Sequence, residues 1–252
     1  MISLTIFITG ATGVLGKRVC SLLIQQGHRV RALCRSQENA TYCRENGIDV
    51  LMGSLFNKAS MMELTRGCDV IMHLASKMPQ AQMPGKKDWQ ENDRIRVEGT
   101  NTLVEAAIAN KVRLFIQPSV AFLYGNHHGE VVMETSKVHR NQLSMVESAI
   151  VMESIIQQKL RGIVPYMILR FGMFYSKDSF HTINMIRNVR DRRMPIVGKE
   201  DYYWNFIHVD DAAAAILHSL QNRQRLANEI LNVSDFNPVS HKYLLKEISR
   251  IV

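Results

Sequence analysis

The sequence lacks the features that direct a chain into a membrane or an oxidising compartment. It contains no apolar run of about 18 residues, the length that a membrane-spanning helix needs, and its N-terminus carries no charged segment of a secretory signal. Its cysteines form no C-x-x-C pair and show no His/Cys metal spacing; they are Cys20, Cys34, Cys43 and Cys68. We therefore expect reduced thiols that mostly pack inside the protein, a cytoplasmic location, no membrane partner and no metal.

Low-complexity tracts and internal repeats are also missing. The 252 residues, 46% of them hydrophobic, are enough for one large α/β domain or one domain with a small lobe. The net charge of +8 fits either nucleic-acid binding or a basic surface with a pocket for an anionic cofactor. Outside residues 187–193 the basic residues are spread along the chain, and no RNA-binding motif accompanies them. We favour the second interpretation and expect no nucleic-acid partner.

Three glycines near the N-terminus carry the strongest signal. Gly10, Gly13 and Gly16 follow a β-rich apolar run and precede a helical pattern. In such a strand–turn–helix unit, Gly10 permits the tight turn, Gly13 lets the backbone approach a phosphate, and Gly16 lets the helix pack close to the strand. A helix N-terminus offers unpaired N–H groups and a favourable dipole. The unit predicts dinucleotide binding, the alternative being an ordinary Gly-rich turn.

Apolar β-rich runs alternate with helical patterns along the chain. Strands are predicted near 3–8, 29–34, 48–52, 69–74, 113–118 and 164–169, and helices near 13–26, 57–66, 88–110, 142–161 and 209–221. This order predicts an α/β fold, a Rossmann-type doubly wound parallel sheet with ligands at the carboxyl ends of its strands. We expect a dinucleotide-binding domain over 1–171 and a small C-terminal substrate lobe over 172–252, interleaved with the first.

The end of the second strand bears on the choice of cofactor. An acid there would bind the ribose 2′-hydroxyl of NAD, but the strand carries none and Glu38 lies too far along. Arg35 and Ser36 stand in its place, and a guanidinium matches a 2′-phosphate by charge and geometry. NADP is therefore predicted, with NAD possible; the alternative is that Arg35 is merely a solvated residue at a strand end.

Seven motifs occur in order along nearly the whole chain. They are residues 9–16, Gly53-Ser54-Leu55, His73-Leu74-Ala75-Ser76, 98–103, 119–125, 169–175 and 205–213. Together they resemble the extended short-chain dehydrogenase/reductases, the NAD-dependent epimerase/dehydratase group. The resemblance implies a nicotinamide dinucleotide cofactor and a small-molecule substrate.

The resemblance extends the expected cofactor site beyond the glycines. With Arg35 and Ser36, the full set is Gly10, Thr12, Gly13, Val14, Leu15, Gly16, Ser54, Leu55, Leu74, Ala75, Ser76, Phe171 and Met173. In it Ser54 and Leu55 would flank the adenine, although position 54 is usually Asp in the family. The segment His208 to Asp211 resembles the family's helix-start signature, and Asp210 or Asp211 is expected to cap the helix that follows, a catalytic role for the two acids being the alternative.

The catalytic residues depart from the family pattern. Members use a Tyr with a Lys four residues later on one helix, and no Tyr here has Lys at that spacing. If Glu153 matches the acid of the family helix, Met145 and Ala149 replace the pair. Val120 falls at the usual Ser position, with Ser119 one residue earlier. The standard proton relay is therefore missing.

Other residues become the catalytic candidates. Ser119 can donate a hydrogen bond to a carbonyl, and Tyr124 can serve as an acid beside a cation. Arg96 and Tyr175 are the predicted substrate residues. Arg94 and Arg96 could together bind an anionic substrate; the alternative is that one of them pairs with an acid such as Asp93 and the other is solvated. The pair His127-His128 invites a metal interpretation, but without a third ligand at suitable spacing we expect exposed histidines.

Three functions are compatible with these features. An NADP-dependent oxidoreductase or epimerase with a non-standard acid leads, because the whole pocket-forming chain is retained. A non-catalytic NADP sensor or scaffold and an RNA binder are the alternatives. A homodimer through the helices at 88–110 and 142–161 is possible, with Met145, Ala149 and Met152 as an apolar stripe.

Overall fold

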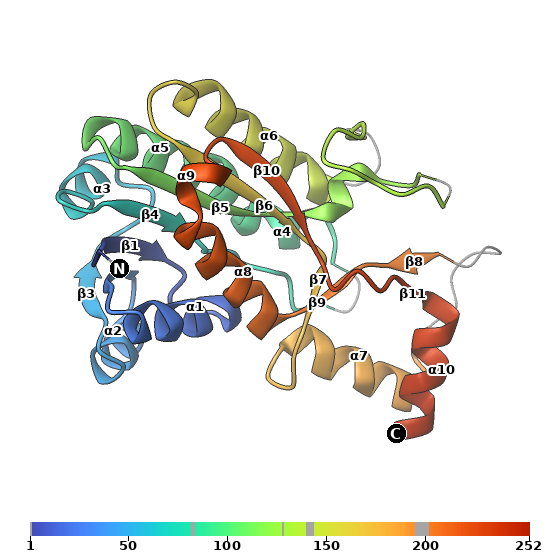
Figure 1. Ribbon diagram of the computed structural model, residues 1–252. Coiled ribbons are helices and arrows are strands. Elements are labelled where there is room, and N and C mark those ends of the chain that lie inside the picture. The colour runs from blue at the N-terminus through green and yellow to red at the C-terminus, as the bar shows by residue number, and fades with distance from the viewer. Residues whose placement is uncertain (1, 82–83, 128, 140–143, 195–201) are drawn as a thin grey trace.

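The computed structural model describes residues 2–81, 84–127, 129–139, 144–194 and 202–252. Its centre is a parallel sheet of seven strands in the order β10-β6-β5-β4-β1-β2-β3 (Figure 1). The strands are β1 Thr5–Thr9, β2 Arg29–Cys34, β3 Asp49–Met52, β4 Val70–His73, β5 Leu114–Val120, β6 Tyr166–Phe171 and β10 Glu229–Val233. This confirms the predicted doubly wound α/β fold.

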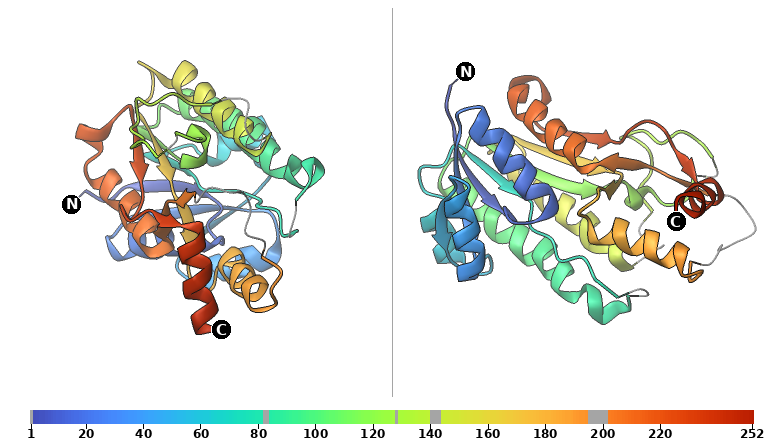
Figure 2. Two further views of the ribbon diagram at one scale, coloured as in Figure 1. Left: turned by 90° about the vertical axis from the view of Figure 1, so that its right-hand side faces the viewer. Right: turned by 90° about the horizontal axis from the view of Figure 1, so that it is seen from below.

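Helices cover both faces of the sheet. Figure 2 shows α1 (Val14–Gln25) and α8 (Val209–Gln221) on one face, with α4 (Lys86–Arg94) and α5 (Thr100–Ala109) on the other. The remaining helices of these layers are α2 Gln37–Glu45, α3 Lys58–Leu64, α6 Ser144–Leu160 and α9 Arg223–Leu226. Because neighbouring side chains of a strand point to opposite faces, the apolar residues of β1 contribute to two separate cores, one on each face of the sheet.

The two cores meet at β1. Ile6 and Ile8 pack on the face covered by α1 and α8, whereas Phe7 packs on the face covered by α5 and α6. Every residue of β4 and β6 is buried. Continuous burial explains why these strands read as unbroken apolar runs rather than as alternating ones.

The predicted helix at 88–110 is interrupted. Between α4 and α5 lies a π-helical turn, η1 (Ile95–Gly99). Gly99 lies so close to the sheet that an added Cβ would come within 2.6 Å of Leu55 Cδ2. The Nε2 atom of His73 lies 3.3 Å from the carbonyl oxygen of Ile95. These contacts fix the extra residue of the turn against the carboxyl end of β4.

The last third of the chain contributes to both the sheet and a lobe. After β6 come β7 (Met173–Tyr175) and α7 (Phe180–Arg190), and then β8 (Tyr203–Trp204) and β9 (Phe206–His208). The chain returns through α8 to β10, which pairs with β6, and ends in β11 (Val239–Ser240) and α10 (His241–Ile251). In Figure 1, α7 and α10 lie together away from the sheet.

Several short or polar elements escaped the sequence reading. α2 is rich in polar residues, and α7 has no buried residue in the described structure. β10 carries only a brief apolar run between polar residues. None of the described helices has both the length and the apolar character to cross a membrane.

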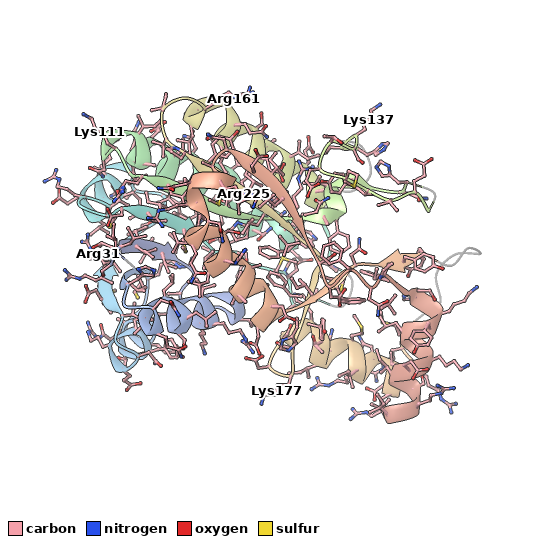
Figure 3. All side chains as sticks on the ribbon, in the orientation of Figure 1. Arg31, Lys111, Lys137, Arg161, Lys177 and Arg225 are labelled. Atoms are coloured by element: carbon pink, nitrogen blue, oxygen red, sulfur yellow. The ribbon has the colours of Figure 1, made fainter. Side chains whose placement is uncertain are left out.

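Basic side chains are distributed over the molecule. Figure 3 places Lys111, Lys137 and Lys177 on different sides of it. Other basic residues are used internally: Arg31 donates from Nη1 to the carbonyl oxygen of Arg66 at 2.9 Å. Some basic side chains therefore make contacts within the protein, and others are solvated.

Candidate functional site

The turn between β1 and α1 can be built only with glycines. Gly10 has a φ of +78°, and an added Cβ would lie 2.6 Å from the backbone nitrogen of Ala75. At Gly16 a Cβ would lie 2.0 Å from the carbonyl oxygen of Gly10. The first of these glycines packs the turn on the segment after β4, and the second brings α1 onto the turn.

The N-terminus of α1 is open to an anion. The helix begins at Val14 after an N-cap glycine, Gly13, and among the described residues no side chain caps it and no acid stands in its first turn. The first backbone N–H groups of a helix have no intrahelical partner. Thr12 and Leu15 flank this end. The geometry therefore fits the pyrophosphate of a dinucleotide.

A buried polar chain fixes the loop after β4, which begins with Leu74, Ala75 and Ser76. Thr9 and His73 stand opposite each other in neighbouring strands, with Thr9 Oγ1 2.6 Å from His73 Nδ1. The backbone N–H of Ala75 donates to Thr9 Oγ1 at 3.3 Å. Burial lowers the pKa of His73 to about 4, so the ring is neutral. The sequence analysis did not predict this role of Thr9 and His73. The signal that could have indicated it is a Thr and a His at the ends of two predicted strands.

Arg35 and Ser36 lie where predicted, at the carboxyl end of β2. The hydroxyl of Ser36 caps α2 by accepting from the backbone N–H of Asn39 at 3.3 Å. The Arg35 guanidinium is largely exposed and its Nη1 lies 3.6 Å from Glu91 Oε1 on α4. An acid, Glu91, therefore does approach the end of β2, but it belongs to α4 and not to the strand itself.

Ser54 and Leu55 differ in accessibility. Ser54 is exposed, and its hydroxyl accepts from the backbone N–H of Phe56 at 3.4 Å. Leu55 is buried in the core that α5 and α6 cover. Of these two, Ser54 alone presents a side chain to solvent at the end of β3.

Ser119 and Tyr124 are brought together by one buried ion pair, Arg170 with Glu153. Arg170 donates to both carboxylate oxygens of Glu153, and its Nη1 donates to Tyr124 Oη at 2.6 Å. Ser119 Oγ donates to Glu153 Oε1 at 2.6 Å, and Tyr124 Oη donates to Asn232 Oδ1 at 2.7 Å. Both hydroxyl protons are thus directed at acceptors within the protein.

The charge balance of this network favours the ionised arginine. Burial alone would lower the pKa of Arg170, but the hydrogen bonds and charge of Glu153, helped by Tyr124, outweigh it and raise the pKa. A cavity of about 540 Å³ reaches Glu153 and Arg170, and its other lining residues are Val138, Ile150, Ser154, Gln157, Gln158 and Arg161. Most of that lining belongs to α6.

Arg94 and Arg96 point to different surroundings. Arg94 is half exposed, pairs with Glu98 at 2.9 Å and covers the ring of Phe56. Arg96 is half-buried on η1, and its Nη1 lies 3.3 Å from Ser148 Oγ on α6. Burial lowers the pKa of Arg96, and the charge of Asp93 opposes that shift. Only the second arginine faces the helix on which the family carries its catalytic pair.

The α6 residues that the resemblance compares with the family's catalytic helix include two buried ones, Ala149 and Glu153. Ala149 is fully buried, and Glu153 follows one turn later. Met145 lies on the same helix, but its side chain is outside the described part. Ala149 and Met152 both pack inside the protein, so the prediction that these two residues belong to an apolar stripe at a dimer interface is wrong.

The remaining predicted cofactor and substrate residues lie at the end of β6 and on β7. Phe171 is buried against the ring of Phe174, whereas Met173 is half-buried on β7. Tyr175 is partly exposed, with its ring 5.1 Å from that of His208. Burial, with Asp235 and Asp211 adding to it, raises the pKa of Tyr175. These residues form the boundary between the sheet and the lobe.

The predicted cap of α8 is wrong. The N-cap is His208, whose Nδ1 accepts from the backbone N–H of Asp210 at 3.3 Å. Asp210 instead pairs with Arg18 of α1, which also binds Asp178 at 2.9 Å. The acid joins α8 to α1, and through Arg18 both helices are tied to the segment after β7 that holds Asp178.

His127 is held by its own loop. Its Nε2 lies 3.3 Å from the carbonyl oxygen of Lys137, and its ring meets that of His139 at 5.3 Å. His128 falls outside the described residues. Within the part of the chain that the structure describes, no three His, Cys, Asp or Glu side chains gather as metal ligands.

The sheet order and the open helix N-terminus define a Rossmann-type dinucleotide-binding protein. The sequence profile of the NAD dependent epimerase/dehydratase family matches residues 6–234, and the chain belongs to this family. The short-chain dehydrogenase/reductase type expected from the motifs is thereby confirmed.

Individual relatives are distant. A 2-alkyl-3-oxoalkanoate reductase from Shewanella oneidensis is 24% identical, with 96% of this chain covered; the chain spans only 64% of that reductase. A 3-diazoavenalumate denitrifying reductase from Streptomyces is 23% identical over 97% of this chain and 80% of its own length. UDP-glucuronic acid 4-epimerase from Bacillus cereus, solved with UDP-glucuronic acid and NAD, superposes with a TM-score of 0.81 at 21% identity, covering 98% and 82% of the two chains. These similarities support an NAD(P)-binding, oxidoreductase- or epimerase-like role.

Proposed function

We propose that the protein is an NADP-dependent oxidoreductase or epimerase that acts on a small carbonyl or sugar-like compound. The observation that carries the proposal is the uncapped N-terminus of α1 behind a turn that only glycines can form. When bound, the nicotinamide supplies or accepts a hydride. The chain's own part is to hold the pyrophosphate at 10–16 and to shape the reacting end with the loop after β4.

The preference for NADP rests on Arg35. Its guanidinium is accessible at the end of β2, where the 2′-position of the adenosine ribose is held in this fold. The weak 3.6 Å contact with Glu91 leaves most of its hydrogen-bonding capacity for a phosphate. As the cap of α2, the Ser36 hydroxyl acts as an acceptor. Its proton therefore remains available for a hydrogen bond to a phosphate oxygen.

Tyr124 is the proton donor in this proposal. Arg170 supplies the positive charge that such a role requires, at 2.6 Å from the hydroxyl. Ser119 is placed as a partner that holds Glu153, and hence Arg170, in position. Tyr124 is 3% exposed, so this role requires that its hydroxyl become accessible when the substrate binds.

Arg96 and Tyr175 complete the proposed substrate site. Arg96 offers a guanidinium next to α6, and Tyr175 offers a partly exposed ring at the entrance to the lobe. The name of the Shewanella oneidensis relative describes a substrate with an oxo group and a carboxylate. That chemistry suits a site that contains an arginine.

Cofactor binding and turnover test different parts of the proposal. Calorimetry with NADP⁺ and NAD⁺ should show uptake of both, with NADP⁺ bound more tightly. Rapid mixing of NADPH-loaded protein with a panel of ketones and sugars should show loss of the reduced-nicotinamide absorbance. No uptake of either cofactor would refute the function.

A control separates catalysis from binding. The variant Tyr124→Phe should retain cofactor affinity and lose turnover if the hydroxyl donates the proton. Cofactor binding without any hydride transfer across the panel would favour the non-catalytic sensor or scaffold. The observation that supports this alternative is that the hydroxyls of Ser119 and Tyr124 already donate to acceptors within the protein.

A further inference from the structure

Arg96 lies in an irregular helical turn that is held in position by the end of β4. It lies in η1, where the helix widens between α4 and α5. The turn rests on the sheet through the contact between His73 Nε2 and the carbonyl oxygen of Ile95. Single π-turns within helices are frequent at functional sites. Here the turn rests on the same histidine that fixes the loop after β4.

The Arg96 side chain lies at the edge where ligands bind in this fold. Its Nη1 contacts Ser148 Oγ on α6 at 3.3 Å. One helical turn earlier, Asn92 Oδ1 accepts from the backbone N–H of Lys77 at 3.0 Å, which ties α4 to the segment after β4. Asn92 and Arg96 are therefore about one turn apart in the chain, the first bonded to the segment after β4 and the second to α6.

An unsatisfied donor on α4 points to a ligand. Asn92 is fully buried, and its Nδ2 atom has no hydrogen-bond partner among the described residues. Buried polar groups in folded proteins are normally paired. An amide donor next to a guanidinium calls for an acceptor of hydrogen bonds.

The chemistry selects the acceptor. A carboxylate takes two parallel hydrogen bonds from a guanidinium and can accept another from an amide. A phosphate also suits a guanidinium, but it carries close to two negative charges at neutral pH. Asp93 adds a negative charge near Arg96, so the local field favours a monoanion over a dianion.

We infer that the substrate is an oxo or hydroxy acid whose carboxylate is bound by Arg96 and Asn92. This inference rests on the proposed function and names the substrate class of the same site. The carboxylate lies on the α6 side of the reacting carbon.

A complex that cannot react tests this assignment. Protein saturated with NADP⁺ is titrated calorimetrically with 3-oxobutanoate, which has no hydride to give, and with butanone, which lacks the carboxylate. The acid should bind and butanone should bind at least about tenfold more weakly, the effect of losing a charged hydrogen bond. Equal binding of the two, or no binding of the acid, overturns the inference.

A matched pair of variants locates the carboxylate. Arg96→Gln should weaken 3-oxobutanoate binding by about tenfold or more, whereas Arg94→Gln removes the same charge from the outer face and should leave it unchanged. Arg96→Lys should retain part of the affinity, which guards against a general effect on folding. Equal weakening by Arg96→Gln and Arg94→Gln contradicts the inference. Loss of NADP⁺ uptake by the unaltered protein would instead refute the proposed function.

Discussion

Arg170 and Glu153 form a buried two-point ion pair. Nε lies 3.1 Å from Oε1 and Nη2 lies 2.6 Å from Oε2, and both side chains are at most 6% exposed. Ser119 and Tyr124 attach to this pair, one to the acid and the other to the base. The pair thereby joins β5, β6 and α6 at the edge of the sheet where ligands are expected.

Removing one partner of this pair should be strongly destabilising. Glu153→Gln leaves the Arg170 charge buried without its counter-ion, and breaking a buried pair in this way costs about 3–5 kcal/mol of unfolding free energy. Urea denaturation measures the loss. Glu98→Gln breaks the exposed pair with Arg94 and should cost at most about 1 kcal/mol. Similar midpoints for the two variants would show that the buried network contributes little.

The glycine turn predicts a graded response to a single added methyl group. Gly16→Ala should disrupt the turn, since its Cβ would lie 2.0 Å from the carbonyl oxygen of Gly10. Gly13→Ala places a Cβ 3.3 Å from the same atom, so the fold should survive while NADP⁺ binding weakens. Gly85→Ala, whose Cβ would meet nothing nearer than 3.8 Å, is the control. Thermal melting and calorimetry on the three variants would contradict this ranking if Gly85→Ala were the most damaging.

Cofactor selectivity should depend on two residues with opposite effects. Arg35→Ala should reduce affinity for NADP⁺ by about tenfold or more, the effect of losing a charged hydrogen bond, and leave NAD⁺ affinity nearly unchanged. Glu91→Gln should raise NADP⁺ affinity, because it removes the acid that pairs with Arg35. The measurement is a titration of each variant with both cofactors. Parallel changes for NADP⁺ and NAD⁺ would exclude Arg35 as the selective residue.

Acid should destabilise the protein through His73. Its pKa in the folded state is about 4, below the ordinary value of 6.5, because the ring is fully buried. The unfolded chain therefore binds more protons between these values, and unfolding free energy falls as pH drops from about 6.5 to about 4, by about 3 kcal/mol in all. Above this range the contribution is fully present.

The His73→Asn variant isolates that effect. It should unfold at lower urea concentration than the original protein at pH 7, and the difference between the two should shrink toward pH 4, because only the original protein loses the histidine contribution. Equilibrium unfolding at several pH values gives both curves. A constant difference across this range would show that His73 does not titrate with unfolding.

Local sequence patterns predicted most of the sheet but not the contacts around the site. The glycine spacing at 10–16 and the buried runs of β4, β5 and β6 depend on neighbours in the chain, and these elements were found within a few residues. α2 and α7 were missed because their burial is slight. Periodicity alone does not reveal a helix that buries so little.

Long-range partners explain the remaining differences. Tyr124 bonds to Asn232, and Asp210 bonds to Arg18, across separations of 108 and 192 residues. A local rule therefore assigned Asp210 to a helix cap, while the fold assigns it to an ion pair. Ser119 and Tyr124 are predictable from their chemistry, but the ion pair that joins them depends on the pairing of β5 with β6, which local patterns do not contain.

The return of the chain to β10 has a consequence for synthesis on the ribosome. β6 is completely buried, yet one of its two neighbours, β10, ends at Val233, far along the chain. Until that stretch has emerged, an apolar strand remains at the margin of a growing sheet, where it can add a strand from another molecule. The nascent protein therefore passes through an interval in which aggregation competes with completion of the fold.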